Sequence, residues 1–180
     1  MALVKSLRRV VHVLAAAGLL VSLGAGTSLA RDREAGWVND IIGLRHFSGL
    51  RCPDMVGGFY RSKVLSADSD RMAGCIYTGD NGLAAVLRQH LSGTGADVAK
   101  DFLEAYKASG FSKVALTGVA QSGISYITRS WTPSKLCETL WHFSGKKADY
   151  TLWLTYSLPG QEAEVGPAVA AFVETLNRQN

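Results

Sequence analysis

Apolar and polar residues alternate along much of this chain with the period of two that is typical of β-strands. Residues 149–156 are the clearest case: even positions hold Tyr, Leu, Leu and Tyr, and the odd positions between them hold Thr, Trp and Thr. This pattern predicts one strand. Further stretches are predicted to be strands as well: residues 57–65, 74–78, 84–91, 113–116, 123–131 and 135–143.

Two other stretches repeat apolar residues at helical spacing. The first follows Gly95 and ends at Gly110, and Thr94 or Asp97 is expected to help start it. The second follows Pro159-Gly160. Each helix has a single apolar stripe and must therefore pack on another surface. The stripes consist of Val98, Phe102, Ala105 and Tyr106 in the first helix and Val165, Val169, Phe172, Val173 and Leu176 in the second.

The connections between the predicted strands are short, whereas parallel strands need long crossovers, so neighbouring strands should be antiparallel. Asn81-Gly82 is a strong hairpin signal because these residues tolerate the positive φ angles of a tight turn. We therefore predict an α+β fold. It consists of a single antiparallel sheet of about six to seven strands, with two main amphipathic helices covering one face, in the order βββαββββα.

Residues 31–50 mix charges, glycine and a few apolar positions, with Val38, Ile41, Ile42 and Arg45 at helical spacing. This segment is predicted to be a short helix or a loose lead-in. The chain then divides into a signal peptide (residues 1–30), an N-terminal lead-in (31–50) and a single α+β domain (51–180), because about 150 residues is a common size for one domain.

The first thirty residues have the layout of a secretory signal peptide. Lys5, Arg8 and Arg9 precede an apolar run over residues 10–23, and Ser28-Leu29-Ala30 follows. The run is shorter than the ~20 residues that span a bilayer. We expect cleavage after Ala30, a periplasmic protein, and contact with the membrane only transiently through the signal peptide.

Removal of this segment changes the charge balance. It holds three of the 19 basic residues and none of the 15 acidic ones, which leaves 16 basic against 15 acidic. The sequence pI of about 9.1 is then mostly a property of the signal peptide. Because no basic block remains, we expect no nucleic-acid partner.

Export permits disulfides, and the mature chain has three cysteines. Cys52 and Cys75 flank a predicted strand and its turn, so a hairpin would bring them together. Cys137 is predicted to be a buried small hydrophobic residue, although its pairing with either of the others stays open. A nucleophilic Cys137 is disfavoured, because His142 has the opposite strand parity and the chain has no Cys-x-x-Cys.

The run Cys52-Pro53-Asp54-Met55-Val56-Gly57-Gly58-Phe59-Tyr60-Arg61, the later Cys75-Ile76-Tyr77 and the closing strand and helix resemble small exported bacterial proteins. Their plan is similar to the PsbP-like fold, an antiparallel sheet with helices on its faces. The resemblance covers most of the mature chain and rests on short motifs. It implies a fold and brings no catalytic residues with it.

Catalytic and cofactor motifs are incomplete. Neither Ser122 nor Ser125 has the flanking glycines of a nucleophile elbow. Gly93-Thr94-Gly95 lacks the later residues of a phosphate-binding loop. The histidines are scattered, so we expect no cofactor and no metal.

The aromatic residues are more suggestive. Trp131, Trp141 and Trp153 come from three consecutive predicted strands and can share one face of the sheet. They are predicted either to form core beneath the helices or, with Trp153 on the open face, to form a binding surface with Arg129 and Trp131.

The function predicted from these features is a non-catalytic binding or interaction module of the cell envelope, with an envelope protein or a small ligand as partner. The alternative is an envelope hydrolase whose active site is assembled from residues distant in sequence. Convergence of a serine, a histidine and a carboxylate in one pocket would favour the hydrolase. A structural or assembly factor is a third possibility.

Overall fold

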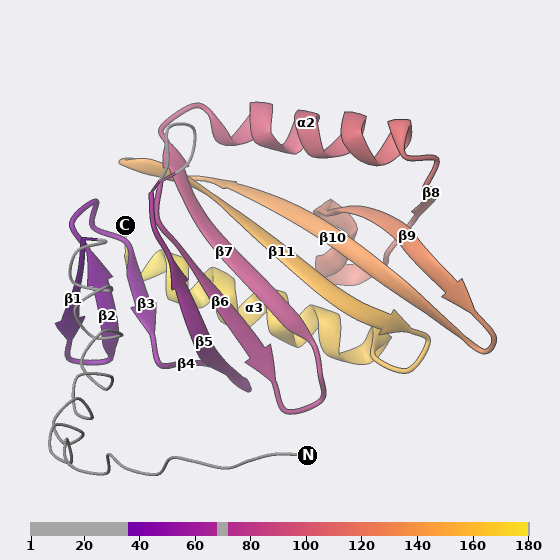
Figure 1. Cartoon of the computed structure of the whole chain (residues 1–180), viewed down its shortest axis with the longest axis horizontal. Coiled ribbons are helices and arrows are strands. Elements are labelled where there is room, and N and C mark those ends of the chain that lie inside the picture. Colours follow the sequence, from indigo (N-terminus) through magenta and orange to yellow (C-terminus); the bar gives the residue numbers. More distant parts are fainter. Residues whose placement is uncertain (1–35, 68–71, 180) are drawn as a thin grey trace, which may run out of the picture.

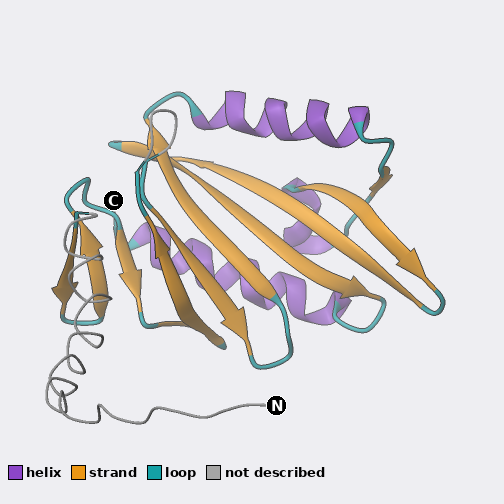
Figure 2. Cartoon of the chain, in the orientation of Figure 1, coloured by secondary structure: helices purple, strands orange, loops and turns teal. Residues whose placement is uncertain are grey.

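The computed structural model describes residues 36–67 and 72–179, which contain two antiparallel sheets (Figures 1 and 2). These described residues are mostly β, with 48% strand and 24% helix, and they form one sheet of eight strands and one of three. The predicted α+β class with a single sheet of six to seven strands is therefore wrong. The predicted signal peptide and its predicted cleavage site lie outside the described residues.

The eight-stranded sheet has the strand order β4-β5-β6-β7-β11-β10-β9-β8. All its strands except β4 lie where the alternating pattern predicted strands. Asn81-Gly82 forms the turn between β6 and β7, and Gly82 has a φ of 84°. The strands are Met55–Val56 (β4), Phe59–Leu65 (β5), Gly74–Gly79 (β6), Ala84–Leu91 (β7), Ser112–Val114 (β8), Ile124–Trp131 (β9), Ser134–Ser144 (β10) and Ala148–Leu158 (β11).

The three-stranded sheet consists of Trp37–Asp40 (β1), Gly43–His46 (β2) and Arg51–Pro53 (β3). The helix considered for this segment is therefore wrong. Ile41 and Ile42 form the turn between β1 and β2, and Val38 pairs with Arg45 across the hairpin. Their helical spacing is a coincidence, because none of these side chains faces a core.

The two helices lie on opposite faces of the large sheet, which corrects the prediction that both cover one face. Helix α2 (Gly95–Ala108) packs Phe102 on Trp153 of β11, with ring centroids 6.4 Å apart. Helix α3 (Glu162–Asn177) packs Phe172 on Tyr77 of β6, at 5.3 Å. A short 3-10 helix, Gly118–Ser122, precedes β9.

Strand register shows that these contacts are on different faces. Trp153 is opposite Val86 of β7, and Val86 is opposite Ile76 of β6, so these three side chains share the α2 face. Tyr77 follows Ile76 and points to the other face. Figure 1 accordingly shows α3 running behind the strands, while α2 lies along their upper side.

The main hydrophobic core lies between the sheet and α3. Side chains from both sheets and from α3 are fully or almost fully buried there, including Leu50, Leu87, Leu152, Leu154 and Phe172. Burial of this apolar surface is the dominant favourable term in folding.

Helix α2 is capped by a residue from a distant strand. Thr94 stands at the N-cap but makes no side-chain cap bond. Asp149 Oδ2 instead accepts hydrogen bonds from the backbone N–H groups of Gly93, at 3.1 Å, and Gly95, at 3.0 Å. A buried carboxylate at this end also complements the helix dipole. Thr94 and Asp97 thus stand at the start of the helix as expected, but the side-chain cap is supplied by Asp149.

Candidate functional site

The hairpin of β1 and β2 ends in two isoleucines that the fold leaves largely uncovered. Ile41 is 98% exposed and Ile42 is 55% exposed. The turn itself is made by its flanking residues. The Asp40 carboxylate accepts a hydrogen bond from the Ile41 N–H at 2.9 Å, and a Cβ at Gly43 would lie 2.3 Å from the Cys52 carbonyl oxygen. Turn chemistry therefore does not account for the two β-branched residues.

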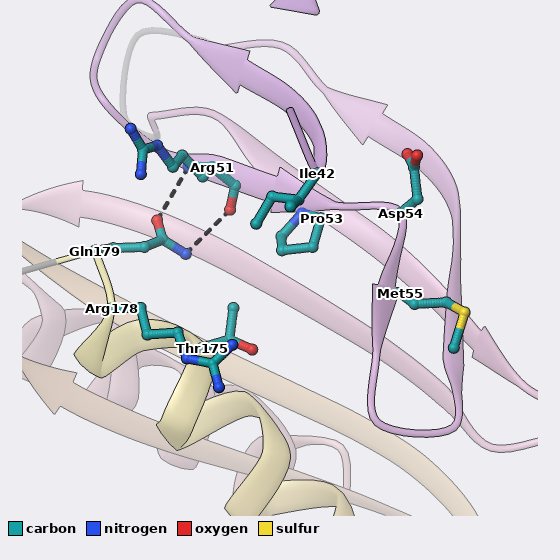
Figure 3. A pocket seen from close by; sticks show the side chains of 8 residues that line it. All are labelled: Ile42, Arg51, Pro53, Asp54, Met55, Thr175, Arg178 and Gln179. Atoms are coloured by element: carbon teal, nitrogen blue, oxygen red, sulfur yellow. Dashed lines mark hydrogen bonds between the residues drawn. The ribbon is translucent and has the colours of Figure 1, made fainter. Parts of the chain in front are cut away.

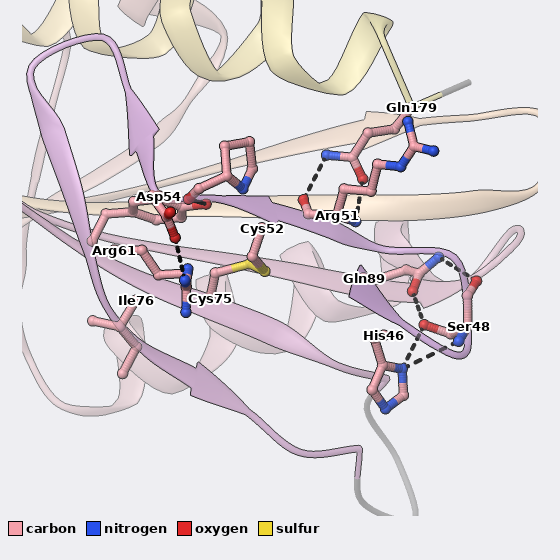
Figure 4. Close-up of a disulfide and its surroundings, with 12 residues drawn as sticks. His46, Ser48, Arg51, Cys52, Asp54, Arg61, Cys75, Ile76, Gln89 and Gln179 are labelled. Atoms are coloured by element: carbon pink, nitrogen blue, oxygen red, sulfur yellow. Dashed lines mark hydrogen bonds and ion pairs between the residues drawn. A yellow bond between two sulfur atoms is a disulfide. The ribbon is translucent and has the colours of Figure 1, made fainter. Parts of the chain in front are cut away.

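A disulfide fastens the three-stranded sheet to the large sheet (Figure 4). It joins Cys52 of β3 to Cys75 of β6, whose Cα atoms are 6.1 Å apart, and both residues are fully buried. The Tyr77 hydroxyl donates a hydrogen bond to the Pro53 carbonyl at 3.1 Å, and burial raises the pKa of Tyr77, which keeps it a donor. The predicted Cys52–Cys75 disulfide is confirmed.

A polar cluster makes a second attachment at the turn between β2 and β3. The Ser48 hydroxyl donates to Gln89 Oε1 of β7 at 2.6 Å and lies 2.8 Å from His46 Nδ1 (Figure 4). Gln89 and His46 are both buried. Buried polar groups that are satisfied in this way hold one geometry, so they fix the position of the turn.

The end of the chain attaches to β3 through one side-chain amide. Gln179 Oε1 accepts a hydrogen bond from the Arg51 N–H, and Gln179 Nε2 donates to the Arg51 carbonyl, both at 3.0 Å (Figure 3). The amide thus pairs with the edge of β3 as a neighbouring strand would. It holds the end of α3 beside the hairpin tip.

These attachments enclose a pocket of about 430 Å³ between the three-stranded sheet and the end of α3. Its size falls within the range of small-molecule sites. In Figure 3, Ile42 and Pro53 approach it from the sheet, while Thr175 and Arg178 approach from the helix. The lining residues are Ile42, Arg51, Pro53, Asp54, Met55, Thr175, Arg178 and Gln179.

Charged groups surround these apolar walls. Arg51 Nε is 3.1 Å from the carboxylate of Asp40, and Arg178 pairs with Glu174 one helical turn earlier. Both arginine side chains are at least half exposed. A guanidinium has five N–H donors, so one ion pair does not exhaust its capacity. The pocket therefore offers an apolar interior with cationic groups on two sides.

Two further hollows are smaller and less suited to binding. One, of about 300 Å³, lies along α3 and is lined mainly by glycine, alanine and proline. The other, of about 340 Å³, lies at the end of β10 beside His142 and Tyr150. Neither combines apolar walls with more than one charged group.

The second of these hollows bears on the hydrolase alternative, because a serine, a histidine and a carboxylate meet at its edge. His142 Nε2 is 3.4 Å from Asp149 Oδ2 and 3.5 Å from Ser144 Oγ. A catalytic triad needs its carboxylate and its serine on different ring nitrogens, so that the proton passes through the ring. Here both contacts use the same nitrogen, and both are long for hydrogen bonds.

Asp149 has a structural task at this position. Burial by itself would raise the pKa of its carboxyl, but hydrogen bonds from the Gly95 N–H, from His142 and from the Gly145 N–H hold the pKa below its ordinary value. The carboxylate is thus stabilised in its charged form as the cap of α2.

Cys137 is free and fully buried, as predicted. Burial raises the pKa of its thiol to about 11, which leaves it protonated at neutral pH. His142 lies five positions along the same strand and points to the other face.

The structure does not bring Arg129, Trp131 and Trp153 together. Trp131 is 48% exposed and pairs with Ser134 at one end of β10, whereas Trp153 pairs with Leu140 beneath α2. Along β10, Ser134 and Leu140 are six residues apart, and six residues of a strand span about 20 Å. Trp141 is buried on the opposite face, so the expectation that the three tryptophans share one face is wrong.

Within residues 36–67 and 72–179, no group of three or more His, Cys, Asp or Glu side chains is placed to hold a metal ion. In the same part of the chain, no helix has the length and hydropathy needed to cross a membrane.

Sequence reasoning missed this pocket. Its walls come from residues 42, 51–55 and 175–179, which only the tertiary fold brings together. One signal was available: Ile41-Ile42 lies between Asp40 and Gly43, so two adjacent large apolar residues are flanked by turn-forming residues.

Comparison with protein-family models, with curated proteins and with solved structures gave no match to this chain. The PsbP-like resemblance therefore remains a prediction.

Proposed function

We propose that this protein is an exported, non-catalytic binding module of the cell envelope that takes its ligand in the pocket between the β1–β2 hairpin and α3. The observation that carries the proposal is the apolar pocket flanked by Arg51 and Arg178. The signal-like N-terminus supports export, and the disulfide supports an oxidising compartment such as the periplasm.

The walls indicate the chemistry of the ligand. Ile42, Pro53 and Met55 offer contacts to an apolar body, and the two guanidinium groups offer charge-assisted hydrogen bonds to an anionic head. The pair between Arg178 and Glu174 is at the surface and therefore weak, so an anionic group can replace Glu174. Arg51 has further N–H donors besides the one that faces Asp40. An anionic amphiphile with a single chain fits both features.

Dodecyl phosphate, kept below its micellar concentration, tests this proposal against the uncharged dodecyl maltoside. We expect saturable binding of the phosphate only, measured by calorimetry or by NMR shifts of residues around the pocket. Thr175→Phe places a ring in the pocket and should weaken binding at least about tenfold.

Ala170→Phe is the matched control, because Ala170 is an exposed residue of the same helix and does not line the pocket. Its affinity should equal that of the wild type. Equal binding of both amphiphiles, or unchanged binding by Thr175→Phe, would contradict the proposal.

The envelope hydrolase is the second candidate, and the meeting of Ser144, His142 and Asp149 is the observation that favours it. Turnover of a generic ester by the wild type that disappears in Ser144→Ala would establish it. The shared ring nitrogen makes binding without catalysis the better supported function.

A further inference from the structure

We propose that the Ile41–Ile42 tip of the β1–β2 hairpin docks on the surface of an anionic lipid bilayer. Docking of the tip would place the pocket next to the bilayer, which is a source of anionic amphiphiles. The docking is argued from separate observations, whereas the delivery of amphiphiles from the bilayer to the pocket rests on the proposed function.

Most of the exposed large apolar side chains lie in the same part of the chain as the tip, although Phe47 is at the opposite end of the hairpin, next to Gly36. Among the residues that the structure describes, five of the eight exposed large hydrophobic residues lie between positions 38 and 55. Ile41 is almost completely exposed, and its neighbour Ile42 contributes to the pocket wall. The tip is therefore apolar both toward solvent and toward the pocket. The five residues are Val38, Ile41, Ile42, Phe47 and Met55.

Two of the four polar backbone groups of Ile41 and Ile42 have partners within the protein. The Ile41 N–H donates to the Asp40 carboxylate at 2.9 Å, and the Ile42 carbonyl accepts from the Asp54 N–H at 2.8 Å. Polar backbone groups that enter a bilayer without partners are costly. These two groups already have partners within the protein, so insertion of the side chains does not require either group to lose a hydrogen bond.

Basic side chains lie on the sheet behind the tip. Val38, Arg45 and Arg51 occupy opposed positions on three adjacent strands, so they share one face of the small sheet. Arg45 and Arg51 are both exposed. Two acidic residues lie at the tip: Asp40 is engaged by Arg51 and by the Ile41 N–H, and Asp54 pairs with Arg61. Apolar residues that project beyond basic ones are the arrangement with which peripheral proteins bind anionic lipid.

The shape of the surface favours a bilayer over a protein partner. A stable protein interface buries about 800 Å² on each partner. A two-residue tip that projects from a short hairpin offers much less than this area. A fluid bilayer accepts a projecting side chain without a complementary pocket.

Vesicle sedimentation tests the docking. The protein is purified from the periplasm, its N-terminus is checked by intact mass, and it is mixed with vesicles of phosphatidylcholine alone or with added phosphatidylglycerol. We expect sedimentation with the anionic vesicles, weakened by salt. Ile41→Asp should lower the partition coefficient about tenfold or more, because it puts a charge in place of an apolar side chain that would enter the bilayer.

Leu91→Asp is the matched control, since Leu91 is 65% exposed on β7 of the large sheet. It should bind vesicles like the wild type. Arg45→Gln should lower binding to the anionic vesicles only, by about fivefold. Circular dichroism shows whether each variant is folded.

Equal vesicle binding by Ile41→Asp and the wild type would overturn the docking proposal, as would a wild type that stays in the supernatant. Self-association that requires Ile41 would also overturn it, because the tip would then be a protein interface. Binding of dodecyl phosphate in solution is measured separately. The docking can therefore fail while the proposed function survives, and the reverse also holds.

Discussion

The two sheets of this protein are held in place by different means. Strands β10 and β11 of the large sheet have eleven residues each, and helices pack on both faces. The small sheet has strands of three or four residues, contributes Trp37 and Leu50 to the core, and is attached further by the disulfide, the Ser48–Gln89 contact and the Gln179 amide. Distributed packing therefore orders one region, whereas the other adds a few identifiable bonds to a small share of the core.

This difference concerns function as well as stability. The candidate pocket and the exposed isoleucines belong to the region with few attachments. Regions of low local stability can move without global unfolding, and binding elements are commonly drawn from them. The large sheet serves as the rigid support against which the hairpin and the end of α3 are positioned.

Removal of the disulfide should separate the two regions most clearly. In a Cys52→Ala, Cys75→Ala double variant we expect a loss of about 3 kcal/mol in the free energy of unfolding, from the 23-residue separation of the cysteines. Hydrogen exchange should accelerate in residues 37–53 and remain slow in β10 and β11.

Cys137→Ala is the control for this experiment, because it removes a buried thiol and leaves the disulfide intact. Faster exchange to the same extent in both sheets of the double variant would show that the regions do not behave separately.

A smaller effect is expected when the cap that Asp149 of the large sheet supplies to α2 is weakened. Asp149→Asn should lower the free energy of unfolding by about 1–2 kcal/mol near neutral pH. The folded-state pKa of Asp149 lies below its ordinary value, so its charge contributes stability above pH ~4 that is lost as the pH falls toward the folded-state pKa.

Urea titrations at several pH values measure this effect. The difference between the wild type and Asp149→Asn should be largest at neutral pH and should shrink below pH ~4. A difference that does not depend on pH would mean that the carboxylate acts by packing and not by charge.

The smallest effect is expected at the amide that closes the edge of β3. Gln179→Ala removes two hydrogen bonds at a partly exposed site, so global stability should fall by about 1 kcal/mol or less. Amide exchange at Arg51 should nevertheless accelerate. Gln179→Glu keeps the acceptor for the Arg51 N–H and should leave that amide protected. Loss of protection in both variants would indicate that the whole chain end has detached.

Local pattern was sufficient for several features. The strands from residue 57 onward follow from alternation within each segment, and both helices follow from their stripes. The disulfide followed from two cysteines flanking one hairpin, which chain connectivity brings close. The tip of the small sheet was misread, because the spacing of Val38, Ile41, Ile42 and Arg45 in a hairpin imitates that of a helix.

What the sequence alone determined is therefore the identity of most strands and helices, since periodicity reports which side chains share a face of one element. The tertiary structure decided which face of the sheet each helix covers, because an apolar stripe shows that a helix packs on another surface but not on which one. It also decided the register that separates Trp131 from Trp153, and the cap that Asp149 supplies to a helix 54 positions earlier. The pocket belongs to this second group, because its walls come from both ends of the described chain and meet only when the core between them is packed.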